Sequence, residues 1–279
     1  MILVLGHCSD KVVGQFMHYC VNNYVDFAFV DLNQLGKSVH LNETHWLFSD
    51  QCLVPHKKIK GVYNRFLDWP EKNKVYMTQY LNLFDWLDNR YCNVINRPKD
   101  TMSNLSKPYQ LEIASQFKSW VIPKSSLIMN THIQIKKPFI CKSISSERSI
   151  VNQVYRNEAK AFYEPALLQA YVPGLNIRVH ACDEAIIAVG IQSDSVDYRY
   201  SRFDNDVFMY HLPGHIERDV LALNKLLGLR FSGIDLIYYQ KKYYFLEANP
   251  SPGYAYFENA LSYPYISKAL LTSLSGAYH

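Results

Sequence analysis

The stretch GIDLIYYQKKYYFLEANPSPG, residues 233–253, contains two apolar runs on either side of the polar residues 240–242. Two such runs around a short polar segment predict a β-hairpin. With residues 240–242 as a three-residue loop, Asp235 lies directly opposite Glu247 on the neighbouring strand. The hairpin is therefore expected to bring two carboxylates together.

Asn249 follows Glu247 by two residues, so its side chain is expected on the same face of the strand. Because opposed like charges destabilise a hairpin, this arrangement needs a positive counter-charge. Hard oxygen donors of this kind suit a magnesium ion that bridges to phosphate. The two prolines of the tail NPSPG, residues 249–253, favour a rigid backbone after the strand. Two alternatives stay open. In the first, Asp235 and Glu247 are ordinary exposed residues of a half-buried hairpin. In the second, a two-residue loop sets Asp235 opposite Ala248.

Four basic residues earlier in the chain are candidate partners for this acidic cluster. Lys107 opens an expected helix, Lys142 ends an expected strand, and Arg178 and Arg199 flank the strands before the hairpin. Phosphoryl transfer is catalysed largely by positioned cations and metal ions that neutralise developing charge. Each residue alone is also typical of a surface charge, and the sequence does not show whether the four converge.

The composition is that of an ordinary folded protein. The 279 residues are 48% hydrophobic and 19% charged, which predicts two or three packed units. The net charge of +4 comes from 29 basic and 25 acidic residues without a long basic run. It favours neither nucleic acid nor a membrane as partner, so a small-molecule or peptide substrate is the expectation.

The six cysteines include no C-x-x-C pair, which argues against a cysteine-rich zinc site or a redox centre. The N-terminus, MILVLGHCSD, has an apolar run of only five residues without a preceding basic region, and no run of about 18 apolar residues follows. We therefore expect a cytoplasmic protein with free thiols.

The first hundred residues predict a small α/β domain, with a strand at 2–5, a helix to about residue 23 and a strand at 27–30. The polar segment RPKDTMSNLSK, residues 97–107, is typical of a linker. We therefore expect domains at 1–98, 99–172 and 173–279. Further elements are expected as strands at 46–48, 62–66, 94–95 and 139–142, and as helices at 74–89, around 111–117 and at 215–227.

Seven stretches follow one another in this order along the chain: INRP (95–98), SKPYQLEIASQF (106–117), FICKSISSERSIV (139–151), LLQAYVPGLNIRVH (167–180), VDYRY (196–200), GIDL (233–236) and FLEANPSPG (245–253). Together they resemble the ATP-grasp ligases across almost the whole chain. The similarity is greatest to the branch that contains ribosomal-protein glutamate ligases, glutathione synthetases and peptide-modifying ligases.

The resemblance implies an α+β, ATP-grasp fold in which two α+β subdomains after the N-terminal domain enclose ATP. It also implies that magnesium is held by Asp235, Glu247 and Asn249. Arg178 and Arg199, with Lys142, are implied as the catalytic residues, the two arginines facing the transferred phosphoryl group or the acceptor carboxylate. The implied nucleotide-binding residues are Lys107 and Lys142 at the phosphates, Ser145 and Arg148 in the segment that corresponds to the lid, the segment Gln169, Ala170, Tyr171 and Val172 at the adenine, and Asn176 near the ribose.

The sequence departs from that family at two places. Many relatives have a glycine-rich lid over the phosphates, whereas this chain has SISSERSI at residues 143–150, whose Ser hydroxyls and Arg148 could contact phosphate. Relatives usually carry an acidic residue after the hinge glutamine, whereas this chain has Ala170.

The predicted function is an ATP- and Mg²⁺-dependent carboxylate-amine ligase that forms an amide bond through an acyl phosphate and releases ADP and phosphate. Its predicted substrate is an amino acid or a peptide with carboxylate and amine groups. The sequence leaves open whether the protein is an oligomer. The alternatives are a phosphotransferase of the same fold and a nucleotide-binding protein without catalysis. Two weaker hypotheses are a metal site at His211 and His215, and Arg65 as either an acceptor-pocket residue or a surface arginine.

Overall fold

The computed structural model describes residues 1–66, 74–90, 92–129, 131–144, 154–156, 158–195, 198 and 205–276. The chain forms two compact units. Unit 1 comprises Met1–Thr101, Leu229–Phe231 and Ser251–His279, and unit 2 comprises Met102–Gly228 and Ser232–Pro250. Division of the chain into three domains stays a prediction. Of the helices in the described ranges, none combines the length and the apolar character needed to cross a bilayer.

A four-stranded parallel sheet forms the centre of unit 1, in the order β2-β1-β6-β7. All five residues of β1 are buried, as expected for a parallel sheet that is covered on both faces. The predicted β-α-β opening is therefore confirmed. The strands are β1 (Ile2–Gly6), β2 (Phe27–Asp31), β6 (Gly61–Asn64) and β7 (Asn93–Ile95).

Unit 1 also contains helices α1 and α2 and a small antiparallel sheet with the strand order β3-β4-β5. Asp10 caps helix α1 by accepting a hydrogen bond from the Val12 backbone N–H, and α2 has the predicted bounds. Trp46, on β4, is fully buried in the core of this unit. The elements are α1 (Lys11–Asn22), α2 (Lys74–Asn89), β3 (His40–Leu41), β4 (His45–Leu47) and β5 (Leu53–Pro55), with short 3-10 helices at Leu32–Gln34 and His56–Lys58.

The C-terminal helices α5 (Ala255–Leu261) and α6 (Tyr265–Leu274) belong to unit 1, and the sequence analysis proposed neither. Glu258, which is 2% exposed, accepts hydrogen bonds from the backbone N–H groups of Ile266 and Ser267. These are the first-turn donors of α6, which have no partner within the helix. A buried carboxylate thus joins the two helices.

Unit 2 contains two small antiparallel sheets and one larger mixed sheet. The strand order of the four-stranded sheet is β12-β11-β14-β9, and β10 pairs with β13. These strands are β9 (Ser125–Ile128), β10 (Thr131–Ile135), β11 (Phe139–Ser143), β12 (Val154–Tyr155), β13 (Glu158–Phe162) and β14 (Ala166–Ala170).

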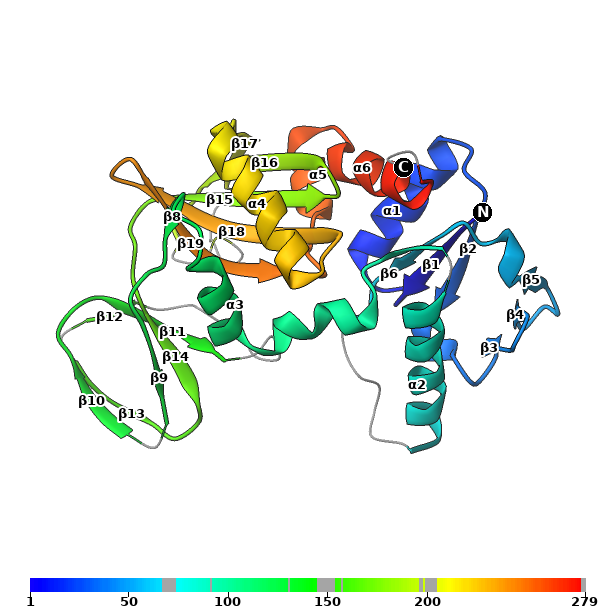
Figure 1. The fold of residues 1–279 in the computed structure, drawn as a ribbon, viewed down its shortest axis with the longest axis horizontal. Coiled ribbons are helices and arrows are strands. Elements are labelled where there is room, and N and C mark those ends of the chain that lie inside the picture. The colour runs from blue at the N-terminus through cyan, green and yellow to red at the C-terminus, as the bar shows by residue number, and fades with distance from the viewer. Residues whose placement is uncertain are drawn as a thin grey trace. The chain divides into compact units, whose positions relative to one another are not determined.

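The larger sheet of unit 2 has six strands in the order β17-β16-β15-β18-β19-β8. Helix α4 (Gly214–Leu227) lies across it (Figure 1), and Ser232 on β18 donates to Asn224 on α4. Gly228 ends α4 in the left-handed conformation, which glycine adopts without strain. The strands are β8 (Trp120–Val121), β15 (Leu175–Cys182), β16 (Ala185–Gln192), β17 (Asp206–Met209), β18 (Phe231–Tyr239) and β19 (Lys242–Asn249).

Two predictions around residue 107 differ from the structure. The expected linker is largely a 3-10 helix, Pro98–Leu105, because its Ser, Asp and Asn residues are also compatible with tight helical turns. Helix α3 (Lys107–Ala114) ends before Phe117, which instead packs against Trp120. Taken with the sheets above, the chain is an α+β protein, as predicted.

Candidate functional site

The hairpin of β18 and β19 has a tighter turn than the sequence predicted. Tyr239 pairs with Lys242, so the loop contains only Gln240 and Lys241, whose φ angles are 48° and 61°. Two consecutive residues with positive φ are the signature of a type I′ turn, which matches the twist of the strands that it joins. The expected three-residue loop is therefore wrong.

Asp235 nevertheless lies opposite Glu247, because the pairing shifts by one residue beyond the turn. Leu236 pairs with Phe245 and Asp235 pairs with Glu247, which leaves Leu246 as the extra residue of a β-bulge. In the uninterrupted register Asp235 would face Leu246. The predicted Asp235–Glu247 pair is confirmed, and the alternative pair with Ala248 is wrong.

The bulge also decides which face of the sheet carries Glu247. Leu236 and Phe245 are fully buried core residues, whereas Asp235 and Glu247 are only partly buried. Because side chains alternate along a strand, Glu247 without the bulge would share the face of Phe245. Asn249, at the end of β19, pairs with Gly233 and follows Glu247 by two residues. Oxygen donors of Asp235, Glu247 and Asn249 therefore lie on one face.

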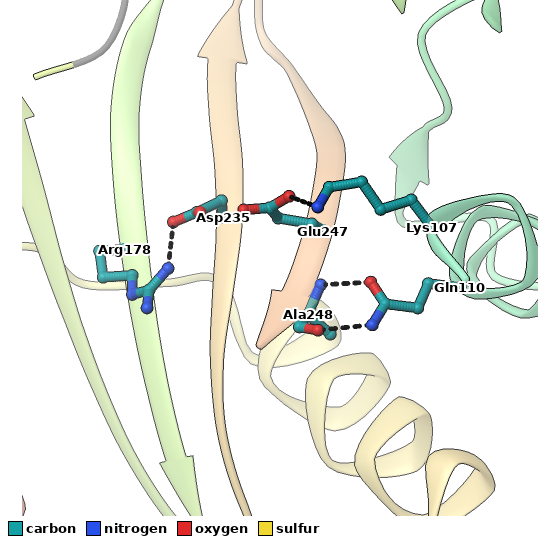
Figure 2. Close-up of polar contacts among 6 residues, drawn as sticks. All are labelled: Lys107, Gln110, Arg178, Asp235, Glu247 and Ala248. Carbon is teal, nitrogen blue, oxygen red and sulfur yellow. Dashed lines mark hydrogen bonds and ion pairs between the residues drawn. The ribbon is translucent and has the colours of Figure 1, made fainter. Parts of the chain in front are cut away.

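Each of the two carboxylates has its own cation (Figure 2). Arg178 Nη1 lies 2.7 Å from Asp235 Oδ1, and Lys107 Nζ lies 3.4 Å from Glu247 Oε2. The two cations approach from different elements, Arg178 from β15 and Lys107 from the first turn of α3. The repulsion between the opposed carboxylates is thus offset on both sides of the pair.

Arg178 is 6% exposed and remains charged. Burial acts to lower the pKa of its guanidinium, but the carboxylate of Asp235, followed by Tyr198, outweighs burial and raises the pKa above its ordinary value. Its buried Nε atom has no hydrogen-bond partner among the described residues. The guanidinium therefore retains a donor beyond its ion pair with Asp235.

This chain matches no protein-family model and no curated protein. Among solved structures it is similar to the macrocyclase MdnC from Microcystis aeruginosa bound to the precursor peptide MdnA, with 18% identity, a TM-score of 0.77, and coverage of 99% of this chain and 100% of that one.

Two further solved structures give the same result. A Chryseobacterium gregarium RiPP-associated ATP-grasp ligase in complex with ADP and a leader and core peptide has 17% identity and a TM-score of 0.76, covering 100% of this chain and 97% of that one. The ATP-grasp ligase PsnB with a variant of its minimal precursor, Mg and ADP has 18% identity and a TM-score of 0.76, with 98% of each chain covered.

This chain has the ATP-grasp fold. At these identities the likeness concerns the fold, and it confirms the fold class that the sequence predicted.

Both lysines predicted for the phosphates of an ATP-grasp site are buried in unit 2. Lys107 is 6% exposed and Lys142, on β11, is 7% exposed. The backbone N–H of Lys107 donates to the carbonyl of Ile144, so the start of α3 lies against the end of β11. Buried ammonium groups require anionic or polar partners, which is consistent with a site for an anion. Their contact with phosphate stays a prediction.

In the segment predicted to contact adenine, residues 169–172, some hydrogen-bonding groups already bond to other residues of the protein. Gln169 is fully buried, and its Nε2 donates to Ser125 Oγ at 3.3 Å. Strand β14 ends at Ala170, so Tyr171 and Val172 lie beyond it. The backbone N–H groups of Ala170 and Tyr171 already donate to the carbonyls of Lys124 and Pro138. Any contact of these two residues with adenine is therefore expected to use their carbonyls.

The remaining candidates are distributed as follows. Asn176 lies on β15 two residues before Arg178, on the same face of the ATP-grasp sheet. Ser145, Arg148 and Arg199 lie outside the described residues. The last candidate, Arg65, belongs to unit 1.

The surface interpretation of Arg65 is wrong. Arg65 is 5% exposed, its Nε donates to Asp10 and its Nη1 donates to the carbonyl of Pro252. The partner at Pro252 is far away in sequence, which is why the sequence did not show the burial. For His211 and His215, the described ranges contain no group of three or more His, Cys, Asp or Glu residues suited to a metal ion.

Sequence analysis missed Gln110, which is 1% exposed. Its side-chain amide bonds both backbone groups of Ala248, between Glu247 and Asn249 (Figure 2). Gln110 follows Lys107 by three residues, so both lie on one face of α3. That spacing was the signal that could have identified it.

The donor set fits magnesium. Two carboxylates and one amide supply the hard oxygen ligands that this ion prefers, and magnesium commonly takes one or two carboxylates together with substrate phosphates. Lys107 and Arg178 balance the two carboxylate charges. Asp235, Glu247 and Asn249 would hold the ion, and Lys107 and Arg178 lie beside them.

Proposed function

We propose that this chain is an ATP- and Mg²⁺-dependent ligase that joins a carboxylate to an amine on a peptide substrate and releases ADP and phosphate. The observation that carries the proposal is the row Arg178, Asp235, Glu247 and Lys107, with Asn249 on the same face. The ATP-grasp fold supports it. Similar proteins are described as bound to ADP, to Mg and ADP, and to precursor, leader and core peptides.

The proposed chemistry has two steps. A carboxylate oxygen of the peptide attacks the terminal phosphorus of ATP, the bond from that phosphorus to ADP breaks, and an acyl phosphate forms. The nitrogen of an amine then attacks the acyl carbon, loses a proton and displaces phosphate. The sum is one amide bond, one ADP and one phosphate.

In this proposal the residues with oxygen donors would bind magnesium, and the cationic residues would bind phosphate. Asp235, Glu247 and Asn249 would hold magnesium, which when bound neutralises negative charge on phosphate oxygens. Lys107 and Lys142 would contact the phosphates, and Arg178 would donate to the transferred group from its Nε–H. We keep Ser145, Arg148 and Arg199 as proposed phosphate and acceptor contacts, Gln169 to Val172 as the adenine segment, and Asn176 near the ribose.

The test uses a synthetic peptide that carries Glu, Asp and Lys side chains, incubated with the protein, ATP and Mg²⁺. We expect ADP release that needs the peptide, and mass spectrometry should show a peptide that has lost the elements of one water. Without lysine and with hydroxylamine added, the peptide should become a hydroxamate, which reports an acyl phosphate. Steady AMP release, or a peptide that keeps the phosphoryl group, would contradict the ligase assignment.

A further inference from the structure

Helix α3 contacts strand β19 through two residues one helical turn apart. Lys107 pairs with the Glu247 carboxylate, and Gln110 bonds the backbone of the next residue, Ala248. Gln110 Nε2 donates to the Ala248 carbonyl at 2.7 Å, and the Ala248 N–H donates to Gln110 Oε1 at 3.1 Å. The amide thus satisfies one donor and one acceptor of the strand (Figure 2).

Ala248 lies on β19 beyond the part of that strand that pairs with β8. On one side Ala248 pairs with Ile234 of β18, whereas β8 pairs with β19 only at Tyr243 and Tyr244. At Ala248 the Gln110 amide therefore takes the place of a neighbouring strand. Because Gln110 and Ala248 are each 1% exposed, water does not compete for these two hydrogen bonds.

Ala248 lies between Glu247 and Asn249, two of the three residues proposed to hold magnesium. It also follows the bulge residue Leu246 by two positions, at a point where an extra residue has already disrupted the regular strand pairing. A metal site requires its ligands to be held to within about 0.5 Å. A bulged strand end needs support to meet that requirement.

We infer that Gln110 is a positioning residue that holds Glu247 and Asn249 in the geometry needed to bind a divalent cation together with nucleotide. The inference rests on the proposed function. Gln110 touches neither metal nor substrate in this account, and it acts through the backbone of Ala248. Residues that orient metal ligands in this way typically contribute about 10- to 100-fold to metal affinity.

The experiment measures equilibrium binding of Mn²⁺, an oxygen-binding stand-in for Mg²⁺, in the presence of ADP, using the electron paramagnetic resonance signal of free Mn²⁺. Two variants are compared with the wild-type protein well below their melting temperatures. Gln110→Met keeps the shape and removes both hydrogen bonds. Gln110→Leu also removes both hydrogen bonds, with a different apolar side chain. Both should weaken Mn²⁺ binding by about tenfold or more.

Leu111→Ala is the matched control, because Leu111 is buried on the same helix but is not bonded to β19. It should lower the melting temperature and change the Mn²⁺ dissociation constant by less than about twofold. Wild-type affinity in Gln110→Met, or equal weakening in Leu111→Ala, would overturn the positioning role alone. Failure of the wild-type protein to bind Mn²⁺ with ADP would overturn the proposed function, and this inference with it.

Discussion

Asp235 and Glu247 lie opposite each other in adjacent antiparallel strands, although the turn between the strands sets a register that would place Leu246 opposite Asp235. One extra residue in the second strand makes up the difference. Because a shift of one residue moves a side chain to the opposite face, the bulge decides that both carboxylates share a face. The proposed metal site therefore depends on a local irregularity of the strand.

Removing either carboxylate charge should abolish turnover. Asp235→Asn and Glu247→Gln keep the size of each side chain while removing a hard anionic ligand, so we expect at least about a hundredfold loss of peptide-dependent ADP release. The circular dichroism spectrum should stay that of the wild-type protein. Glu184→Gln, at an exposed turn, should keep wild-type turnover. Wild-type turnover in both site variants would exclude this site.

The hairpin turn should tolerate glycine better than its present residue. Lys241 has a φ of 61°, a conformation that costs an ordinary residue about 1 kcal/mol and glycine much less. Lys241→Gly should therefore raise the melting temperature. Lys242→Gly, at the first position of the strand, should lower it, because glycine weakens a strand. The opposite order in thermal melts would show that the turn is not of this type.

Local patterns in the sequence predicted much of the fold and part of the site. The bounds of α2 were predicted from helical periodicity, and the opposition of Asp235 and Glu247 from a three-residue loop between two apolar runs. The predicted loop was one residue too long because Leu246 simply continues the apolar run that precedes it, so nothing in the pattern marks it as a bulge. The site prediction was thus correct about the pair and wrong about the turn.

Residues whose role depends on distant partners could not be predicted in the same way. Arg65 is buried because Asp10 and the carbonyl of Pro252 accept its hydrogen bonds, and Gln110 matters because it meets Ala248, 138 positions away. The spacing of Lys107 and Gln110 places both on one face of α3, but the local sequence does not indicate the partner of either Gln110 or Arg65.

The stability of the protein should depend on the carboxylate of Glu258 at the start of helix α6. Glu258 accepts from two backbone N–H groups at the start of α6, from the Ser267 hydroxyl and from Gln15. Glu258→Ala would leave buried donors unsatisfied, so we expect a loss of about 2 to 4 kcal/mol in the free energy of unfolding. Glu184→Ala, at an exposed turn, should change it by less than about 0.5 kcal/mol. Urea titrations of the two variants measure the difference, and equal losses would contradict this role.

His56 should make stability depend on pH in the acid range. Its Nδ1 accepts from Trp86 Nε1, and burial, followed by the charges of Arg90 and His45, lowers its pKa from 6.5 to about 4. The unfolded chain therefore binds a proton more readily than the folded chain between these values, and stability falls as pH decreases from about 6.5 toward 4. Thermal melts at a series of pH values should show this fall, and His56→Gln should reduce it. An unchanged pH dependence in the variant would contradict the assignment to His56.

The central claim is that Asp235, Glu247 and Asn249 bind magnesium together with nucleotide. The most direct test is the melting temperature of the wild-type protein and of Glu247→Gln with ADP alone, with Mg²⁺ alone and with both, since a ligand that binds only the folded state raises the midpoint. We predict a rise in the wild-type protein that needs both ligands and is absent in Glu247→Gln. No shift at millimolar nucleotide, or an equal shift in Glu247→Gln, would contradict the claim.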